Sequence, residues 1–146
     1  MAFDAFLKID GVEGSSESKG HPGEIEISSF SWGETQTGNV GSGGGGGAGK
    51  VQFQDFHFTM NSTKASPVLM RTCATGEHIK EATLTCRKAG GSQQDFLIIK
   101  MNDVIVSSYS VGGASDDGEV MDQLSLAFVK IDYVFREIND KGEVVG

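Results

Sequence analysis

The sequence predicts an all-β protein, mainly an antiparallel β-barrel of about seven or eight strands with one short side helix and one long extended loop. Segments of alternating polar and apolar residues recur along the 146-residue chain, and turn-forming residues separate them. Glycine accounts for 21 residues, about twice its usual share. A closed or nearly closed barrel accommodates this many strands without exposed edges. The length predicts a single domain over residues 1–146.

Two strand signals lie in the first quarter of the chain. Residues 3–9 carry apolar side chains at their odd positions and predict a half-buried strand. A polar surface loop is expected over residues 11–23, because its composition offers nothing to pack. The apolar positions then change from odd to even across Ser28–Ser29, which is typical of a β-bulge in a long, bent strand. Ser31 lies between the two inward-facing aromatic residues of this strand and therefore faces outward.

The most distinctive segment is a long polar loop over residues 33–49. It ends in a run of glycines between Gly41 and Gly49, and ordering such a run costs unusually much backbone entropy. We therefore expect the loop to be mobile unless a partner holds it. The next strand is expected over residues 51–60, with a second bulge near Gln54–Asp55, where the apolar positions shift again.

One segment, residues 66–76, has the signals of a helix. Ser66 is expected to cap it, Pro67 suits its first turn, and Gly76 suits the position after its end. The predicted apolar stripe of this helix consists of Val68, Leu69, Thr72 and Cys73.

The second half of the chain carries the remaining strand signals. Alternating residues predict strands over residues 82–87, 96–101, 104–111 and 124–135, and the apolar positions of the last of these shift near Phe128. Turns or loops are expected at residues 88–92, around Asn102–Asp103, and at residues 112–118.

Charge and composition argue against several classes of partner. A net charge of −8 argues against nucleic acid or an anionic membrane as the main partner, because both are bound largely through Lys and Arg. No stretch approaches the length of a membrane span, and the first residues lack the features of a secretion signal. Cys73 and Cys86 have no zinc-ligand spacing and are expected to be free, buried thiols.

The motifs that could carry chemistry are weak. Gly44 and Gly49–Lys50 approach a phosphate-binding loop, but Val51 occupies the position of the required hydroxyl residue, and a strand is expected to follow. Asp55 and His57 could share one face of a strand, yet two ligands do not make a metal site. We therefore expect no enzymatic activity, no cofactor and no metal.

Eight segments, in a single order from about Phe3 to Tyr133, resemble the haemolysin-coregulated proteins (Hcp), which form the inner tube of bacterial type VI secretion systems. These segments are residues 6–14, 23–33, 48–51, 55–59, 66–69, 73–76, 82–90 and 104–109. Members of the family commonly continue into a further C-terminal strand with a Trp-containing end, which residues 141–146 do not contain.

The resemblance implies a homohexameric ring with a central channel. Rings of this family stack into a tube inside a contractile sheath, are capped by a spike protein, and can carry effector proteins in the lumen. It also implies assembly in the cytoplasm followed by secretion without a signal peptide. Ser31 becomes a candidate for the lumen wall. The ring-stacking loop would consist of Gly33, Glu34, Thr35, Gln36, Thr37, Gly38, Asn39, Val40, Gly41, Ser42, Gly43, Gly44, Gly45, Gly46, Gly47, Ala48, Gly49 and Lys50.

Two alternatives stay open at this point. A monomeric β-barrel could hold a small apolar ligand in its interior, and its oligomeric state would distinguish it from a ring subunit. A metal-dependent barrel enzyme would need a cluster of His and carboxylate residues, which cannot be assembled from this sequence.

Overall fold

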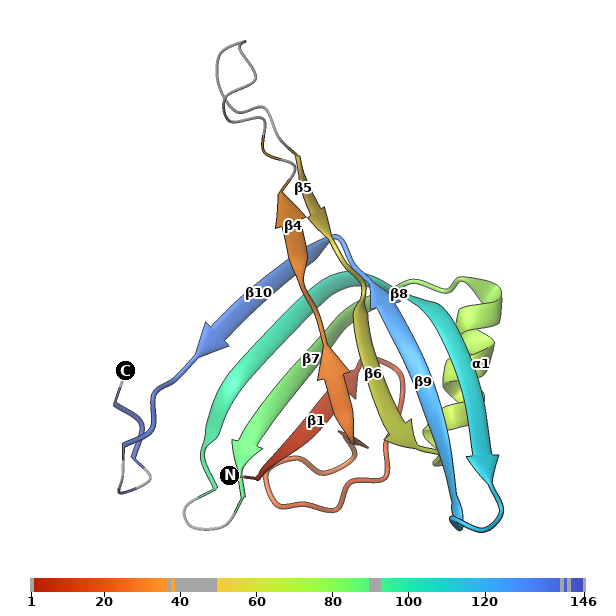
Figure 1. The fold of residues 1–146 in the computed structure, drawn as a ribbon, viewed down its shortest axis with the longest axis horizontal. Coiled ribbons are helices and arrows are strands. Elements are labelled where there is room, and N and C mark those ends of the chain that lie inside the picture. The colour runs from red at the N-terminus through yellow and green to blue at the C-terminus, as the bar shows by residue number, and fades with distance from the viewer. Residues whose placement is uncertain are drawn as a thin grey trace.

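The computed structural model describes residues 2–36, 38, 50–89, 93–139, 141 and 143–145. Antiparallel strands form a barrel in this part of the chain, with one helix on its flank and a two-stranded ribbon that projects from one end (Figure 1). The elements are β1 (Phe3–Ile9), β2 (Ile25–Ile27), β3 (Ser29–Ser31), β4 (Glu34–Gln36), β5 (Val51–Phe53), β6 (Phe56–Asn61), α1 (Ala65–Thr75), β7 (Ile79–Lys88), β8 (Asp95–Ala114), β9 (Glu119–Ala127) and β10 (Lys130–Phe135).

A direct chain connection joins the two end strands of the sheet. Its strand order is β2-β1-β7-β8-β9-β6-β3, with β10 paired to β8. β2 and β3 thus lie at opposite ends of the order, and the single residue Ser28 joins them; its N–H donates to the carbonyl of Thr59 at 2.8 Å. The prediction of a bulge at Ser28–Ser29 was wrong. The apolar positions shift there because the chain passes from β2, which pairs with β1, to β3, which pairs with β6. The predicted antiparallel barrel is confirmed.

One 20-residue strand, β8, replaces the two strands expected around Asn102–Asp103. Asp103 adopts a left-handed φ of 53° and the chain bends without leaving the sheet. The first half of β8 pairs with β7 and β10, and its second half pairs with β9. The loop expected at residues 112–118 is correspondingly short, because β8 continues to Ala114 and β9 begins at Glu119.

Three further strand predictions change at their ends. The strand expected over residues 51–60 divides at Gln54–Asp55 into β5 and β6, as the shift of apolar positions indicates. The strand expected over residues 124–135 divides at residues 128–129 into β9 and β10. β7 is longer than the predicted 82–87. Of the turn expected at residues 88–92, residues 90–92 lie outside the described part of the chain.

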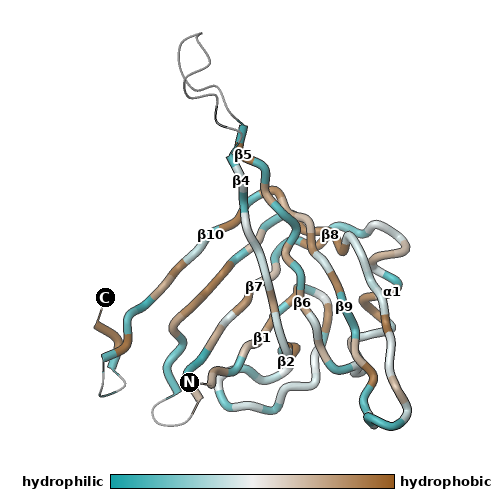
Figure 2. Tube along the Cα trace, viewed as in Figure 1, coloured by the Kyte–Doolittle hydropathy of each residue, from teal (hydrophilic) through white to brown (hydrophobic). Residues whose placement is uncertain are grey.

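The core is built from the inward faces of the strands, and apolar residues recur along β7 and β8 (Figure 2). The side chains of Leu7, Phe56 and Leu84 are fully buried. Phe3, which was expected to face the core, is 49% exposed; it is the first residue of β1 and makes T-shaped contacts with Phe30 and Phe96. Phe6, on the opposite face of β1, is fully buried.

The loop over residues 11–23 explains how Phe6 is covered. His21 is 7% exposed and stacks on the Phe6 ring with centroids 4.5 Å apart. Its Nδ1 lies 3.1 Å from both carboxylate oxygens of Glu24, and its Nε2 lies 3.1 Å from Oδ1 of Asp95. The expectation that this loop has nothing to pack was therefore wrong.

The helix occupies the expected place but is anchored differently. Ser66 does not cap it; its hydroxyl donates to the buried carboxylate of Asp122 at 2.5 Å and accepts from the N–H of Thr63 at 3.0 Å. Val68 is 43% exposed, and the buried stripe consists instead of Ala65, Ser66, Leu69 and Thr72. Gly76 ends the helix with the expected left-handed φ of 67°. In the described part of the chain, no helix is long and apolar enough to span a membrane.

Candidate functional site

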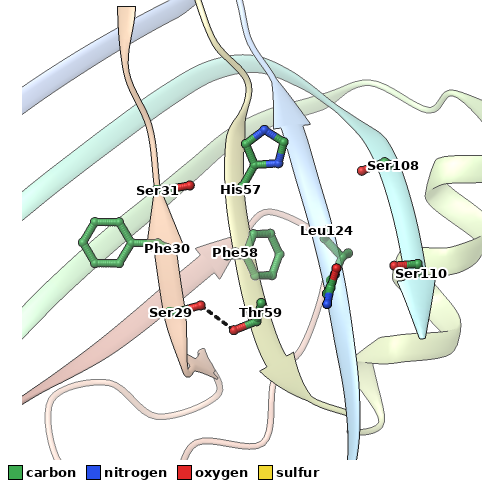
Figure 3. A pocket seen from close by; sticks show the side chains of 10 residues that line it. Ser29, Phe30, Ser31, His57, Phe58, Thr59, Ser108, Ser110 and Leu124 are labelled. Atoms are coloured by element: carbon green, nitrogen blue, oxygen red, sulfur yellow. Dashed lines mark hydrogen bonds between the residues drawn. The ribbon is translucent and has the colours of Figure 1, made fainter. Parts of the chain in front are cut away.

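A polar face extends over four neighbouring strands on one side of the barrel (Figure 3). The strand register places its residues in two rows that cross β3, β6, β9 and the second half of β8. We define the polar face by these rows, which are Ser29–Thr59–Gln123–Ser110 and Ser31–His57–Ser125–Ser108.

Strand alternation explains why this face is polar. Between the two polar rows, the register aligns four residues of opposite character, which are Phe30, Phe58, Leu124 and Tyr109. Phe58 and Leu124 are each 2% exposed and belong to the core. Because successive side chains of a strand point to opposite faces, the serine residues of the flanking rows lie on the face opposite to this core. Ser31 is accordingly exposed, as its sequence position predicts. Ser125 is nevertheless only 3% exposed, and its hydroxyl lies within hydrogen-bond distance of those of Ser107 and Ser108.

Hydroxyl groups dominate the chemistry of the polar face. The Oγ of Ser29 and the Oγ1 of Thr59 lie 2.6 Å apart, and the Oγ atoms of Ser108 and Ser125 also lie 2.6 Å apart. His57 is the one ionisable residue of the two rows, and neither row contains a carboxylate. A shallow hollow of about 280 Å³ lies over this surface. Such a surface is well hydrated and carries little charge.

An arm projects from the end of the barrel above the polar face (Figure 1). It is a ribbon in which β4 pairs with β5, and Glu34 lies opposite Phe53. Three aromatic rings fix its base: Trp32 stacks on Phe53 with centroids 6.4 Å apart, and Phe128 lies 6.3 Å from each of them. The long loop was therefore predicted too broadly, because its first residues are paired strand.

The structure describes only part of the predicted stacking loop. Glu34, Thr35 and Gln36 form β4, and Gly33, Gly38 and Lys50 are also described. The other predicted loop residues, Thr37 and residues 39–49, lie outside the described part of the chain, and they include most of the resemblance to a phosphate-binding loop. Lys50 is followed by β5 and not by a helix.

The candidate catalytic and metal-binding residues do not form a site. Among the residues that the structure describes, no group of three or more His, Cys, Asp and Glu could hold a metal ion. Asp55 accepts a hydrogen bond from the Oγ of Ser107 at 2.7 Å, and His57 points toward the hollow of the polar face. Cys86 is buried, and desolvation raises the pKa of its thiol from 9.0 to about 11, which keeps it protonated. Cys73, which was expected to be buried, is only half-buried.

Known proteins share the sequence pattern and the fold of this chain. A family model described as "Type VI secretion system effector, Hcp" matches residues 6–135. The chain belongs to the Hcp family. Protein hcp1 of Pseudomonas aeruginosa is 46% identical over 136 residues, which are 91% of this chain and 84% of that protein.

Solved Hcp structures share the whole architecture. A type six secretion system protein has a TM-score of 0.90 at 27% identity, and the match covers 99% of this chain and 91% of the other. Hcp1 from Salmonella typhimurium has a TM-score of 0.79 at 31% identity, with 99% and 92% covered. This Hcp-family chain is thus a type VI secretion system protein with the fold of its relatives.

Sequence reasoning placed Ser31 on an outward face and considered His57 only as a possible metal ligand, and it did not single out the other six residues of the polar face. Each of them lies on a strand whose outward positions are polar, so the alternation was visible. The missing information was which strands are neighbours, because Ser29 and Ser110 share a row although 81 residues separate them. Only the strand register brings these distant residues onto one surface.

Proposed function

We propose that this Hcp-family chain is a structural subunit of the type VI secretion inner tube, which forms hexameric rings that stack and are exported. The observation that carries the proposal is the polar face, because it extends without interruption across four strands on one side of the barrel. A subunit that turns such a face toward a common axis contributes one sixth of a hydrated channel wall.

The chemistry of the polar face suits passage of protein cargo. Hydroxyl groups form hydrogen bonds with water and with passing chains. The two rows contain no Asp, Glu, Lys or Arg, so they attract neither sign of charge strongly. Ser31 lies at the β3 edge of this wall. The lumen would thus carry or chaperone effector proteins without binding them tightly.

The arm supplies the contact between rings. It leaves the barrel at one end, where Val51 and Phe53 are 44% and 52% exposed. Burying these side chains against an adjacent ring is favourable, at roughly 25 cal/mol per Å² of apolar surface removed from water. The predicted stacking loop, residues 33–50, would then contribute to the contact between adjacent rings.

The remaining partners follow from family membership. A tube of stacked rings would lie inside a contractile sheath, meet a spike protein at its tip, assemble in the cytoplasm and leave the cell with the spike. The net charge of −8 agrees with protein partners in place of nucleic acid. The subunit would have no catalytic activity.

The test measures mass and then the placement of the polar face. Size-exclusion chromatography with light scattering should give about six times 15.5 kDa, and negative-stain images should show rings. In a Cys73→Ser background, Ser31→Cys carrying a maleimide gold cluster should place density inside the ring. Ser15→Cys, on the exposed loop, is the matched control.

Either readout can contradict the proposal. A monomer of 15.5 kDa would favour the alternative of a monomeric barrel that binds a small apolar ligand. Rings that carry the Ser31 gold label on their outside would retain the assembly but reject the polar face as the lumen wall.

A further inference from the structure

Exposed apolar side chains gather on two opposite flanks of the barrel. One flank is formed by β10 and the start of β1, where Phe3, Tyr133 and Phe135 are 49%, 59% and 57% exposed. The other is formed by the hairpin of β8 and β9 beside α1, where Val111 and Val120 are 57% and 51% exposed. Figure 1 shows β10 on the left and this hairpin on the right. Exposed apolar surfaces of this kind are typical of sites that bind another protein.

The first flank contains a hollow of about 440 Å³ with an aromatic floor. Phe96 lies at its centre and makes edge-on contacts with Phe3 and Phe135, with ring centroids 6.0 Å and 6.3 Å apart. The Nζ of Lys88 lies 5.9 Å from the Phe96 ring centroid, and Arg136 also lines the hollow. We call these five residues the basic aromatic hollow. Glu137 is the one acidic residue of its lining.

The second flank ends in an acidic turn. Asp116, Asp117 and Glu119 are exposed where β8 turns into β9, and Val111 and Val120 flank them. We call residues 111–120 the acidic tip. The chain contains neither Lys nor Arg between residues 101 and 129, so no nearby basic residue of the same segment neutralises it.

The two surfaces are complementary in both charge and apolar character. Lys88 and Arg136 line the hollow beside its aromatic rings, whereas the acidic tip offers carboxylates beside two exposed valines. We propose that the acidic tip of one copy docks in the basic aromatic hollow of a second copy. This proposal rests on the ring proposed above and names the surfaces through which neighbouring subunits meet.

The placement of the surfaces agrees with a closed ring. The start of β1 and the end of β10, which line the hollow, and the turn between β8 and β9 lie at the end of the barrel away from the arm, on opposite flanks (Figure 1). Head-to-tail contacts between two different surfaces generate a ring when the rotation closes. Within the described residues, β10 pairs only with β8, and the second half of β8 pairs only with β9 and has α1 packed against it.

Charge reversal tests the pairing directly. The tip variant is Asp116→Lys with Asp117→Lys, and the hollow variant is Lys88→Glu with Arg136→Glu. In each variant alone, the tip and the hollow carry charge of the same sign and repel each other at every interface. We expect the rings of each variant to dissociate at a subunit concentration at least about tenfold higher than that at which wild-type rings dissociate. An equimolar mixture restores opposite charges at every contact when the two variants alternate, so it should regain the ring mass.

A matched control separates pairing from net charge. Asp10→Lys with Glu17→Lys changes the charge of the chain by the same amount as the tip variant, on exposed residues of another surface. This control should keep the ring mass. Circular dichroism of each variant verifies that it is folded.

The outcomes separate the two proposals. A wild-type monomer would overturn the ring and the docking together. Wild-type rings that persist in both reversal variants would overturn the docking alone and assign the hollow to another occupant. Variants that dissociate but are not restored in the mixture would also overturn the pairing of these two surfaces.

Discussion

At the scale of single residues, burial gives the two thiols different reactivities. Cys86 is 1% exposed and its pKa is raised to about 11, whereas Cys73 is half-buried on α1. At pH 8, a pKa two units above the ordinary value leaves about a hundredfold less thiolate. We expect a maleimide to modify Cys73 and to spare Cys86 in the folded protein, as followed by mass spectrometry. Faster native labelling of Cys86, with both thiols equally reactive in denaturant, would contradict this.

The same shift sets the sign of a pH effect. Folding raises the pKa of Cys86 above 9.0 by burying the thiol, so the protonated form is favoured in the folded state. Its contribution to stability is fully present below pH 9 and is lost as the pH rises toward 11. Tyr109 acts in the same direction, because burial and the neighbouring Asp122 carboxylate raise the pKa of its phenol.

At the scale of elements, the loop over residues 11–23 depends on one glycine. The N–H of Gly14 donates to the carbonyl of Gly23 at 2.8 Å, and a Cβ at Gly14 would overlap the backbone of Glu24 and Ile25. We expect Gly14→Ala to lower the free energy of unfolding by about 1–3 kcal/mol, measured by urea denaturation. Gly112→Ala, whose Cβ meets nothing within 4 Å, should change it by less than about 0.5 kcal/mol. Equal effects of the two substitutions would contradict this account.

The elements also show what the sequence can and cannot predict. Local patterns located the strands and the helix, because alternation and the Gly76 end signal depend on adjacent residues. The fully buried Phe6 and the crossing at Ser28 depend on distant partners, Asp95 with His21 and Thr59 with Ser28. Such contacts leave no periodic signal. The polar face beyond Ser31 was missed for the same reason.

At the scale of the whole molecule, charge favours the proposed contact within a ring and opposes the proposed contact between rings. The tip and the hollow attract each other within a ring, so added salt weakens this contact. Stacked rings repel each other, because six copies at −8 each carry −48. Salt should therefore shift the balance from isolated rings toward stacks until the lateral contact begins to fail.

This balance gives a measurable prediction for stacking. Between about 10 mM and 150 mM NaCl the screening length falls from about 30 Å to 8 Å, so the repulsion between rings becomes short-ranged. Sedimentation velocity should show a growing fraction of species larger than one ring over this interval. The control with Asp10→Lys and Glu17→Lys halves the ring charge from −48 to −24, and its stacking should depend less on salt. Stacking that is independent of salt, or that depends on salt equally in both proteins, would contradict this prediction. It would show that charge repulsion does not limit tube assembly and that another interaction, such as burial of the apolar surface of the arm, does.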